Sequence, residues 1–568
     1  MKNIIRFDQL PYKRIDYEKT KKDVENLINQ LKESSCFKEY LSIFQKIIDI
    51  QNEIEEMCDY ADIRNMRDSE DEYFEQEMTY WNEYKSKFDL LFNPFYELCF
   101  HSKYKEELSK FVPPNFFHII ECQLKITSPD IIDLTKKENE LKNEYRKILR
   151  EKIVYKGEER NLSFISGLFT NKDRKIRQKA HDTVNDFYYK KQSKLDQLFF
   201  DLITVRNEIA KKLGFHDYAE YSLYALKRFG YNYSDISHFR NYIIEYIIPL
   251  CKKLNQWKKE QLGIEDLKYY DTIFFEDMPK PIYSGKYLLK EFGDCLKEID
   301  IELYALYQEM LDKNYIDLEN RDHKVNFAIT NYLTKTGLPV ITGNYKNTYA
   351  DIQTTSHELG HAFQKYHAGI MDQNYVISPL LKYPTFEIAE MFSHAMELIT
   401  MHHLNRLFTD EDYQKYCFME IYHFVGVLPY ICLVDEFQEQ IYTKENLKKE
   451  NIRTVWLKLA HKYELGVSNT GHINLESGGY FYRQSHIFLN PFYYIDYALS
   501  YFGAFSIANA CNENLELFQK IGSVASYYPF DELIEKFDMP NPFDEEAVKN
   551  IAQQLEQQLI QYKNTINE

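Results

Sequence analysis

The sequence contains little glycine and little proline, 18 Gly and 16 Pro among 568 residues. These two residues form most tight turns and long loops, and both interrupt helices. Their scarcity disfavours an architecture of many short strands joined by turns. We therefore expect a mainly α-helical protein.

The sequence also lacks the marks of a secreted or membrane protein. Its nine cysteines are odd in number, widely scattered and contain no C-x-x-C pair, which is typical of reduced thiols in a cytoplasmic protein. The N-terminal segment meets Arg6, Asp8 and Pro11 before an apolar run can form, so we expect no secretory signal. The uncharged run Ile421–Val434 is shorter than the roughly 20 residues that a bilayer requires. We expect a cytoplasmic protein without a membrane span.

Positive charge is in deficit: 70 Lys and Arg face 88 Asp and Glu, which gives a formal net charge of -18 and an isoelectric point near 5.5. A surface that reads nucleic-acid phosphates or anionic lipid needs clustered basic residues. This balance disfavours both partners. Hydrophobic residues reach 44% and aromatic residues 16%, which excludes a disordered acidic chain.

Apolar residues recur at helical spacing over most of the first 320 residues. Between Tyr17 and Phe111 this pattern predicts several long amphipathic helices, ended by the Pro113-Pro114 pair. Further helices are expected in four tracts: Asp130–Glu151, Lys172–Lys212, Tyr233–Leu262 and Leu288–Lys313.

The pattern changes after Lys324. The segment VNFAITNYLTKTGLPVITGNYKN alternates β-branched and aromatic residues around Gly337, which predicts a two-stranded ribbon of a small sheet. Helical spacing resumes at Thr348 and continues almost to the C-terminus. A helical chain with one small sheet at this position suggests a specific role for that sheet.

A metal-binding motif follows the ribbon directly. In HELGH, His357 and His361 are four residues apart, so on a helix both imidazoles can bind one zinc ion. Glu358 lies beside them and can accept a proton from water. Fewer than about 0.1 such matches are expected by chance in a chain of this composition.

The third ligand is not adjacent. Position 380, where an aminopeptidase-type glutamate would lie, is Leu380. His367 approximates a metzincin-type spacing, but Gln364 replaces the required glycine, so the helix should continue and turn His367 away. Glu390 and Glu397 lie seven residues apart on one face of a later apolar helix, about 10 Å along its axis. Only one of these two carboxylates can bind a given zinc ion.

Three segments together resemble the oligoendopeptidase F branch of the thimet oligopeptidase family of zinc metallopeptidases. They are HELGHAFQ after ITGNYKNTYADIQTTS, then PTFEIAEMFSHAMEL, and finally QSHIFLNPFYYIDYALSYFGAF. A weaker likeness includes the helical region around Arg177 and Arg206, so the resemblance covers about Asn161 to Pro540. The first 150 residues are similar to the family only in helical character.

The resemblance implies one Zn²⁺ ion held by His357, His361 and Glu390, with Glu358 as the general base. Glu397 or Glu387 would orient a ligand histidine from behind. The resemblance also implies that side chains late in the chain contact the transition state, namely His486, Tyr494 and Tyr497.

The late residues leave alternatives open. Tyr494 and Tyr497 are three apart after Pro491 and can share one helix face, but Tyr493 with Tyr497 would serve equally well. The segment GHINLESGGYFY resembles a glycine-rich substrate-binding loop of the family, so His472 is an alternative to His486.

The resemblance implies a fold of two helical lobes around a deep substrate channel, with a small zincin-like sheet beside the zinc helix. Residues 1–155 would form an N-terminal helical region and residues 156–568 the catalytic domain. Within that domain, residues 156–323 would be an upstream helical part and about 324–545 the zincin core.

The implied activity is hydrolysis of short unfolded peptides by a zinc metalloendopeptidase, with the strand Leu338–Tyr345 pairing with the substrate backbone. Two alternatives stay open. One is a metallocarboxypeptidase of related helical fold, for which no carboxylate-binding group is identified. The other is an inactive zinc-binding scaffold, which would have no use for Glu358. The sequence leaves the cleavage preference and the oligomeric state open.

Overall fold

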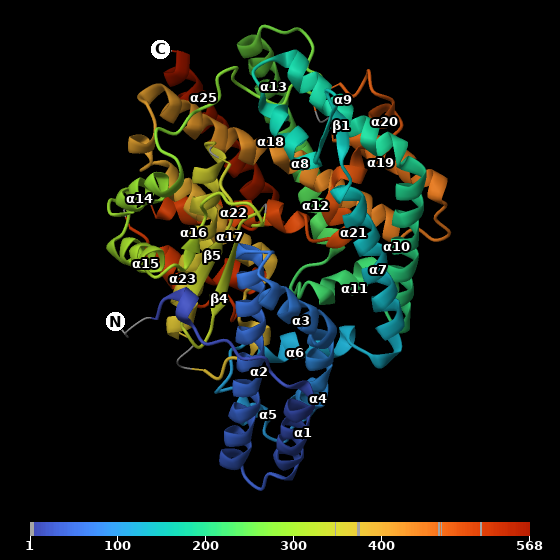
Figure 1. The fold of residues 1–568 in the computed structure, drawn as a ribbon, viewed down its shortest axis with the longest axis vertical. Coiled ribbons are helices and arrows are strands. Elements are labelled where there is room, and N and C mark those ends of the chain that lie inside the picture. Colours follow the sequence, from blue (N-terminus) through green and yellow to red (C-terminus); the bar gives the residue numbers. More distant parts are fainter. Residues whose placement is uncertain are drawn as a thin grey trace.

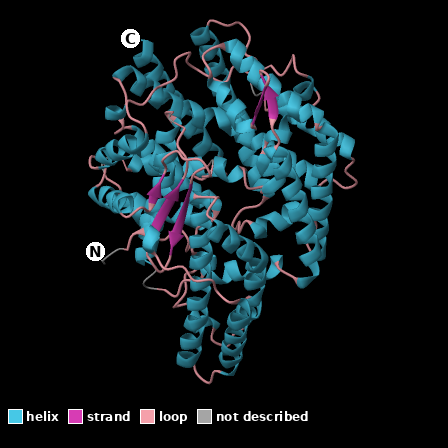
Figure 2. Ribbon diagram, viewed as in Figure 1, coloured by secondary structure: helices cyan, strands magenta, loops and turns pink. Residues whose placement is uncertain are grey.

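A computed structural model describes residues 5–325, 327–346, 348–371, 375–463, 466, 468–511 and 514–567. Helices dominate this part of the chain, and its strands form two small sheets (Figure 2). A continuous hydrophobic core extends from Phe7 near the N-terminus to Leu559 near the C-terminus. The expectation of a mainly α-helical fold is confirmed.

The N-terminal region is entirely helical, and its first helices form the narrow end of the molecule (Figure 1). Aspartates begin two of them: the side chain of Asp16 accepts a hydrogen bond from the backbone of Lys19, and Asp71 caps the backbone of Tyr73. The helices are α1 (Tyr17–Glu33), α2 (Phe37–Arg67), α3 (Glu72–Leu91), α4 (Asn93–Phe100), α5 (Lys105–Leu108), α6 (Phe116–Ile126) and α7 (Ile132–Arg150).

The middle of the chain adds a short hairpin and further helices. The hairpin strands are β1 (Ile153–Tyr155) and β2 (Glu158–Arg160). The helices are α8 (Leu162–Ser166), α9 (Arg174–Lys190), α10 (Gln192–Lys212), α11 (Tyr218–Ala225), α12 (Tyr233–Tyr242), α13 (Ile248–Leu262), α14 (Gly285–Leu296) and α15 (Ile301–Asp312).

Two of the predicted tracts each consist of two helices instead of one. Lys191, with φ -102° and ψ 3°, turns the chain between α9 and α10 inside the tract Lys172–Lys212. Apolar spacing continues through this turn, so the pattern does not reveal it. In Leu288–Lys313 the break lies at Asp300, whose carboxylate accepts hydrogen bonds from the N–H groups of Glu302 and Leu303 and so starts α15.

The tract Tyr233–Leu262 is helical throughout, as predicted. A π-helical turn at Ile243–Ile247 separates α12 from α13. Pro249 follows this turn, and because proline has no N–H group it cannot continue the regular hydrogen-bond ladder.

The C-terminal part contains the second sheet and the longest helices. Its strands are β3 (Ile316–Asp317), β4 (Ile329–Leu333) and β5 (Leu338–Thr342). Its helices are α16 (Ala350–Met371), α17 (Phe386–Met401), α18 (Asp410–Tyr442), α19 (Ile452–Lys462), α20 (Ile473–Glu476), α21 (Ser485–Leu489), α22 (Ile495–Ala510), α23 (Glu516–Gly522), α24 (Phe530–Lys536) and α25 (Glu545–Asn567).

The sheet has three strands in the order β3-β5-β4. β4 and β5 form the predicted antiparallel ribbon, with Leu333 opposite Leu338, while β3 pairs in parallel with the other side of β5. β5 is therefore the central strand, and the prediction that Leu338–Tyr345 accepts an added strand is wrong. β3 lies shortly before the ribbon in sequence but has only two residues, so no local pattern revealed that it occupies this edge. β4 is the edge strand beside α16 (Figure 1).

Helix α18 is long and apolar enough to span a membrane by length and composition alone. Within the structure, however, 72% of its most apolar window is buried. Pro429 lies inside this helix, and the uncharged run Ile421–Val434 belongs to it. Burial of this kind is typical of the core helix of a large helical protein.

Helices α16 and α17 pack unusually closely, because a glycine lies at their contact. A Cβ atom built on Gly360 would lie 2.4 Å from the carbonyl oxygen of Phe392 and 2.7 Å from the Cα of Ser393. No side chain fits in that space, so Gly360 sets the distance between the two helices.

We expect Gly360→Ala to lower the free energy of unfolding by about 1–3 kcal/mol, because the added methyl group must push α17 away. Urea denaturation measures this difference. Gly426→Ala in α18 is the matched control: a Cβ there meets nothing within 4 Å, and alanine favours a helix by up to about 1 kcal/mol. Equal stability of the two variants would contradict the role given to Gly360.

Candidate metal centre and active site

Helix α16 presents His357, Glu358 and His361 toward the interior of the protein. The helix starts near Asp351, whose carboxylate accepts hydrogen bonds from the backbone N–H groups of Lys346 and Thr348. Four-residue spacing places the two imidazoles on one face, with ring centroids 5.0 Å apart. This is the local geometry that the HELGH motif predicted.

Helix α17 brings Glu390 against the two histidines. Its Oε2 atom lies 3.3 Å from Nε2 of His357 and 3.6 Å from Nε2 of His361. One ligand atom from each residue lies within 4.8 Å of the others, so the three can hold one metal ion. Two imidazole nitrogens and one carboxylate oxygen form the donor set of many catalytic zinc sites. The residues present therefore fit the metal that the family resemblance implied.

The pKa values of the three ligands are shifted in different directions. Burial raises the pKa of Glu390. Its hydrogen bond with His357 and the electrostatic attraction of the His361 and His357 imidazoles outweigh burial, so the pKa of Glu390 lies well below its usual range. Burial lowers the pKa of His361 to about 3. Burial also opposes the charged form of His357, yet hydrogen bonds to Glu390 and Glu397 raise its pKa well above the usual value. In the metal-free protein, His357 therefore carries the proton that a metal must displace.

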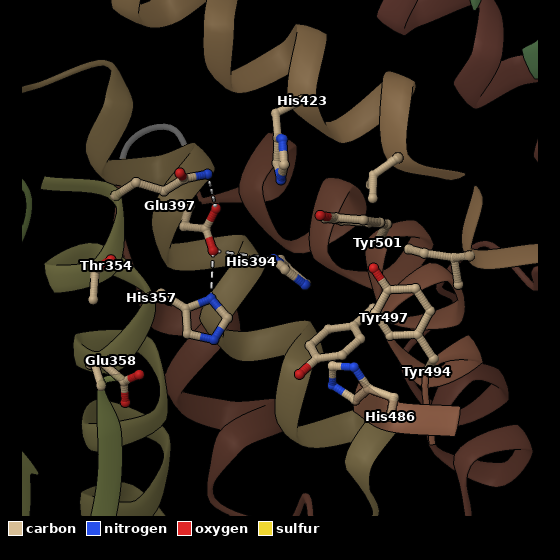
Figure 3. Close-up of a pocket in the computed structure, with 14 residues that line it drawn as sticks. Thr354, His357, Glu358, His394, Glu397, His423, His486, Tyr494, Tyr497 and Tyr501 are labelled. Atoms are coloured by element: carbon tan, nitrogen blue, oxygen red, sulfur yellow. Dashed lines mark hydrogen bonds and ion pairs between the residues drawn. The ribbon is translucent and has the colours of Figure 1, made fainter. Parts of the chain in front are cut away.

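Glu397 orients His357 by binding Nδ1, the ring nitrogen that does not face Glu390. Its Oε1 atom accepts a hydrogen bond from Nδ1 of His357 at 2.5 Å and another from Nδ1 of His394 at 3.2 Å (Figure 3). His357, His394 and Glu397 also satisfy the distance condition for a metal site, but these hydrogen bonds already explain their proximity. Of the two glutamates predicted for this orienting role, the structure places Glu397 there. Glu387 instead accepts a hydrogen bond from Tyr231.

Glu358 is buried beside the metal ligands and is held by the edge strand. The hydroxyl group of Thr330 on β4 lies 2.6 Å from Oε2 of Glu358 and 3.0 Å from its carbonyl oxygen. Burial raises the pKa of Glu358, while His357 and Thr330 lower it. A carboxylate with a raised pKa that can reach the metal ligands is suited to accept and return a proton.

The late residues lie across from α16. Tyr497 lines both cavities that flank the metal group, whereas Tyr494 and His486 line one of them. Tyr493 donates its hydroxyl hydrogen to Oε1 of Glu390 at 2.9 Å, and its oxygen lies 3.1 Å from the hydroxyl of Tyr497. Both members of the Tyr493–Tyr494 alternative thus contact the site, Tyr493 through the ligand Glu390.

The hydrogen-bond partner of His486 determines which of its ring nitrogens carries the hydrogen. Nε2 of Gln484, an amide nitrogen that can only donate, lies 2.7 Å from Nδ1 of His486. Nδ1 therefore accepts, and neutral His486 carries its hydrogen on Nε2. Burial lowers the pKa of His486, which favours this neutral form.

Two other histidines lie away from this constellation. His472 is 3.2 Å from Asp186 and caps the short helix α20, so the structure does not place it beside His486. His367 packs on the ring of Phe363 and faces Glu302. Among the described residues, neither belongs to a group that can hold a metal.

Buried arginines hold the segment that carries these aromatic residues. Arg206 is completely buried and donates to the carbonyl oxygens of Ile487 and Phe488. Arg228 donates to the carbonyl oxygen of Phe492 at 2.7 Å and pairs with Asp496. Phe492 has a φ of 65°, which is strained for a bulky residue and turns the chain just before Tyr493.

Two cavities adjoin the metal group. The first, about 420 Å³, is lined by α16, α17, α18 and α22 (Figure 3). The second, about 600 Å³, lies on the opposite side of the histidines, along β4 and the segment 379–390. His357, Glu358 and Tyr497 line both, so the metal group lies where the two cavities meet.

The edge of β4 is partly occupied by side chains. Nζ of Lys365 donates to the carbonyl oxygen of Thr330 at 2.6 Å, and the N–H group of Tyr332 donates to the hydroxyl of Tyr383 at 3.3 Å. Lys365 follows His361 by one helical turn, so its position on this face was readable from spacing. Thr330 and Tyr383 carry no comparable signal, because only the packing of distant segments brings them here.

Comparison with known proteins agrees with this geometry. Residues 7–127 match the peptidase M3 N-terminal domain, and residues 168–284 and 298–550 match peptidase family M3. The chain belongs to peptidase family M3. It is thus a peptidase, of a family whose members are metallopeptidases.

Solved structures place this M3 peptidase in the oligoendopeptidase F branch. Pz peptidase A, solved with an inhibitor, is 29% identical with a TM-score of 0.90 over 98% of this chain and 99% of its own. A structure described as oligoendopeptidase F is 28% identical with a TM-score of 0.90 over the same shares. Another, from Bacillus anthracis, is 27% identical with a TM-score of 0.85 over 98% of both chains. No curated protein matches the sequence.

We expect Glu397→Gln to weaken the affinity for Zn²⁺, used as the test ion, by about 10- to 100-fold, because the amide no longer fixes the charge and tautomer of His357. Competition with a chelator of known affinity measures the change. Glu387→Gln is the control on the same helix, since Glu387 contacts Tyr231 and not a ligand. Equal affinities of both variants and the wild type would refute the role of Glu397.

Metal affinity should also rise with pH. Glu390 is already deprotonated and His361 already neutral near neutral pH, so binding displaces one proton, that of His357. We expect the apparent Zn²⁺ affinity to increase about tenfold per pH unit between about pH 5.5 and 7.5. The measurement requires a non-coordinating buffer. An affinity independent of pH would show that His357 is unprotonated in the free protein.

Proposed function

We propose that this M3 peptidase is a zinc-dependent endopeptidase that hydrolyses short unfolded oligopeptides. The observation that carries the proposal is the group His357, His361 and Glu390 with Glu358 beside it, at the junction of two cavities. Space on both sides of the metal group can accept residues on both sides of the scissile bond. The side chains of His357, His361 and Glu390 are only 22%, 13% and 8% exposed, and a recessed site of this kind favours peptides over folded proteins.

Zinc, when bound by His357, His361 and Glu390, would polarise the scissile carbonyl and activate the attacking water. Glu358 accepts the proton of this water and returns it to the leaving amine, a transfer that its raised pKa supports. Thr330 keeps the carboxylate of Glu358 in place through its 2.6 Å hydrogen bond.

Donors on the opposite wall would stabilise the negative charge that develops on the carbonyl oxygen. Because the hydroxyl hydrogen of Tyr493 is engaged by Glu390, the hydroxyl of Tyr497 is the donor in the 3.1 Å contact between the two tyrosines. Tyr497 would turn this hydrogen from Tyr493 to the substrate carbonyl. His486 offers its Nε2–H group. Preorganised donors of this kind contribute most where water is excluded.

The substrate backbone would pair with β4, the edge strand, and its direction follows from the cavities. On α16, Thr354 lines only the first cavity and Lys365 only the second, so this helix runs from the first cavity toward the second. Ala328, just before β4, lines both cavities, whereas Asn331 on β4 lines only the second, so the strand runs in the same direction. Antiparallel pairing is the more stable arrangement. The residues before the scissile bond would then occupy the second cavity, and those after it the first.

This arrangement argues against the carboxypeptidase alternative. Such an enzyme would need a cation in the first cavity to bind the terminal carboxylate. None of the described residues that line this cavity is a lysine or an arginine. The lysines Lys227 and Lys365 line the second cavity instead.

The test is digestion of a mixed-length peptide pool by the zinc-loaded wild type and by Glu358→Gln. We expect the variant to keep its zinc and to lose activity by about 10²- to 10⁴-fold, because the water proton has no acceptor. Exposed Glu535 on α24 provides the control Glu535→Gln, which should leave activity unchanged.

Two results would overturn the proposal. A zinc-containing Glu358→Gln variant that cleaves as fast as the wild type would exclude the general-base mechanism. Peptides with a free C-terminus that are cleaved, while their amidated forms are not, would favour a carboxypeptidase.

A further inference from the structure

The wall of the first cavity that faces away from α16 carries three polar side chains that the proposed chemistry does not use. They are His394 on α17, His423 on α18 and Tyr501 on α22 (Figure 3). Although they lie on three separate helices, the three side chains converge on one space directly beside His357.

His394 offers an unused acceptor. Its Nδ1 atom lies 3.2 Å from the carboxylate of Glu397, which only accepts hydrogen bonds, so Nδ1 carries the hydrogen and Nε2 has a free lone pair. Nε2 is buried, the residue is 6% exposed, and Nε2 has no hydrogen-bond partner in the described structure. The ring centroid lies 5.2 Å from that of His357 and 4.1 Å from that of Tyr501.

His423 and Tyr501 supply donors. The imidazole of His423 points into the cavity, the residue is exposed, and it has no hydrogen bond to another described residue (Figure 3). The hydroxyl of Tyr501 likewise forms no hydrogen bond in the described part of the chain, while its ring packs on Phe424. His394 and Tyr501 are each 6% exposed, and unpaired polar groups of buried residues cost free energy unless a ligand satisfies them.

The remaining cavity wall limits what can bind. Both oxygens of Glu397 are engaged, by His357 and His394 on one side and by Gln353 at 3.2 Å on the other. Val427 and Ile431 make the rest of this wall apolar. A ligand group here needs an apolar stem, one hydrogen-bond donor for His394 and one acceptor for His423 or Tyr501.

We propose that His394, His423 and Tyr501 form a subsite for a carboxamide side chain, glutamine or asparagine, on the substrate residue that follows the scissile bond. The carboxamide N–H group donates to Nε2 of His394, and its oxygen accepts from Tyr501 or His423. A carboxylate would face the lone pair of His394. An ammonium group can donate to His394, but it offers no acceptor for the hydrogens of Tyr501 and His423. The subsite rests on the proposed function and on the direction of the bound peptide.

The experiment compares peptides that differ only in the residue after the cleaved bond: Gln, its near-isostere Met, Glu and Lys. For the zinc-loaded wild type we expect kcat/KM for Gln to exceed that for Met by about tenfold, the effect of one or two satisfied hydrogen bonds. Tyr501→Phe and His423→Leu should each reduce this ratio by about threefold or more, with the Met peptide affected by less than about twofold. His238→Leu, an exposed histidine on α12, is the control and should keep the ratio.

The possible failures are distinguishable. If no peptide is hydrolysed, the proposed function is wrong. If the wild type cleaves the Gln and Met peptides equally well, or prefers Glu or Lys, the carboxamide subsite is wrong while the peptidase stands. If Tyr501→Phe and His423→Leu lower kcat/KM for the Gln and Met peptides by the same factor, the two residues stabilise the fold and do not recognise the substrate side chain. Binding of the Gln and Met peptides to zinc-loaded Glu358→Gln provides a second measurement of the same ratio, independent of turnover.

Discussion

The hydrogen bond between Nδ1 of His357 and Oε1 of Glu397 joins α16 to α17 where the metal ligands converge. It depends on close helix packing, which Gly360 permits because the carbonyl oxygen of Phe392 occupies the space that a side chain would need. The same packing places Glu390 within reach of both histidines. Ionisable groups shielded from solvent would be costly individually, and this contact lets buried Glu390 and the half-buried histidines compensate one another.

The opposite wall is positioned by a second set of buried charges. Arg206 and Arg228 bind main-chain carbonyl groups around Phe492, so they hold the backbone that carries His486, Tyr493 and Tyr497. The left-handed conformation of Phe492 persists because these contacts and its buried ring outweigh the strain. Precision at the site therefore comes from residues that are distant from the metal in sequence and do not contact it.

The two cavities differ in chemistry, which gives the site a direction. Lysines and the edge of β4 border the second cavity, while imidazole and phenol groups border the first. Glu358 and Tyr497 lie at their junction. A peptide bound along β4 would therefore meet different groups on each side of the bond to be cleaved.

Much of the site follows from local sequence, because helical spacing alone determines which residues share a face. His357, Glu358 and His361 are together on α16 for this reason, and the scarcity of glycine and proline predicted the mainly helical fold. The resemblance of three segments to oligoendopeptidase F pointed to Glu390 and to the late aromatic residues. The start of α15 also has a local cause, the capping side chain of Asp300.

Other features were decided only by the tertiary structure. Spacing could not show that β3 pairs with β5 and makes β4 the edge strand, because a strand of two residues has no periodicity and its pairing depends on how the separate segments pack. It could not choose between Glu387 and Glu397 behind His357, nor bring Thr330 to Glu358. The convergence of His394, His423 and Tyr501 is of the same kind. Each of these contacts joins separate elements, and their relative positions depend on the packing of the whole core and not on any one segment.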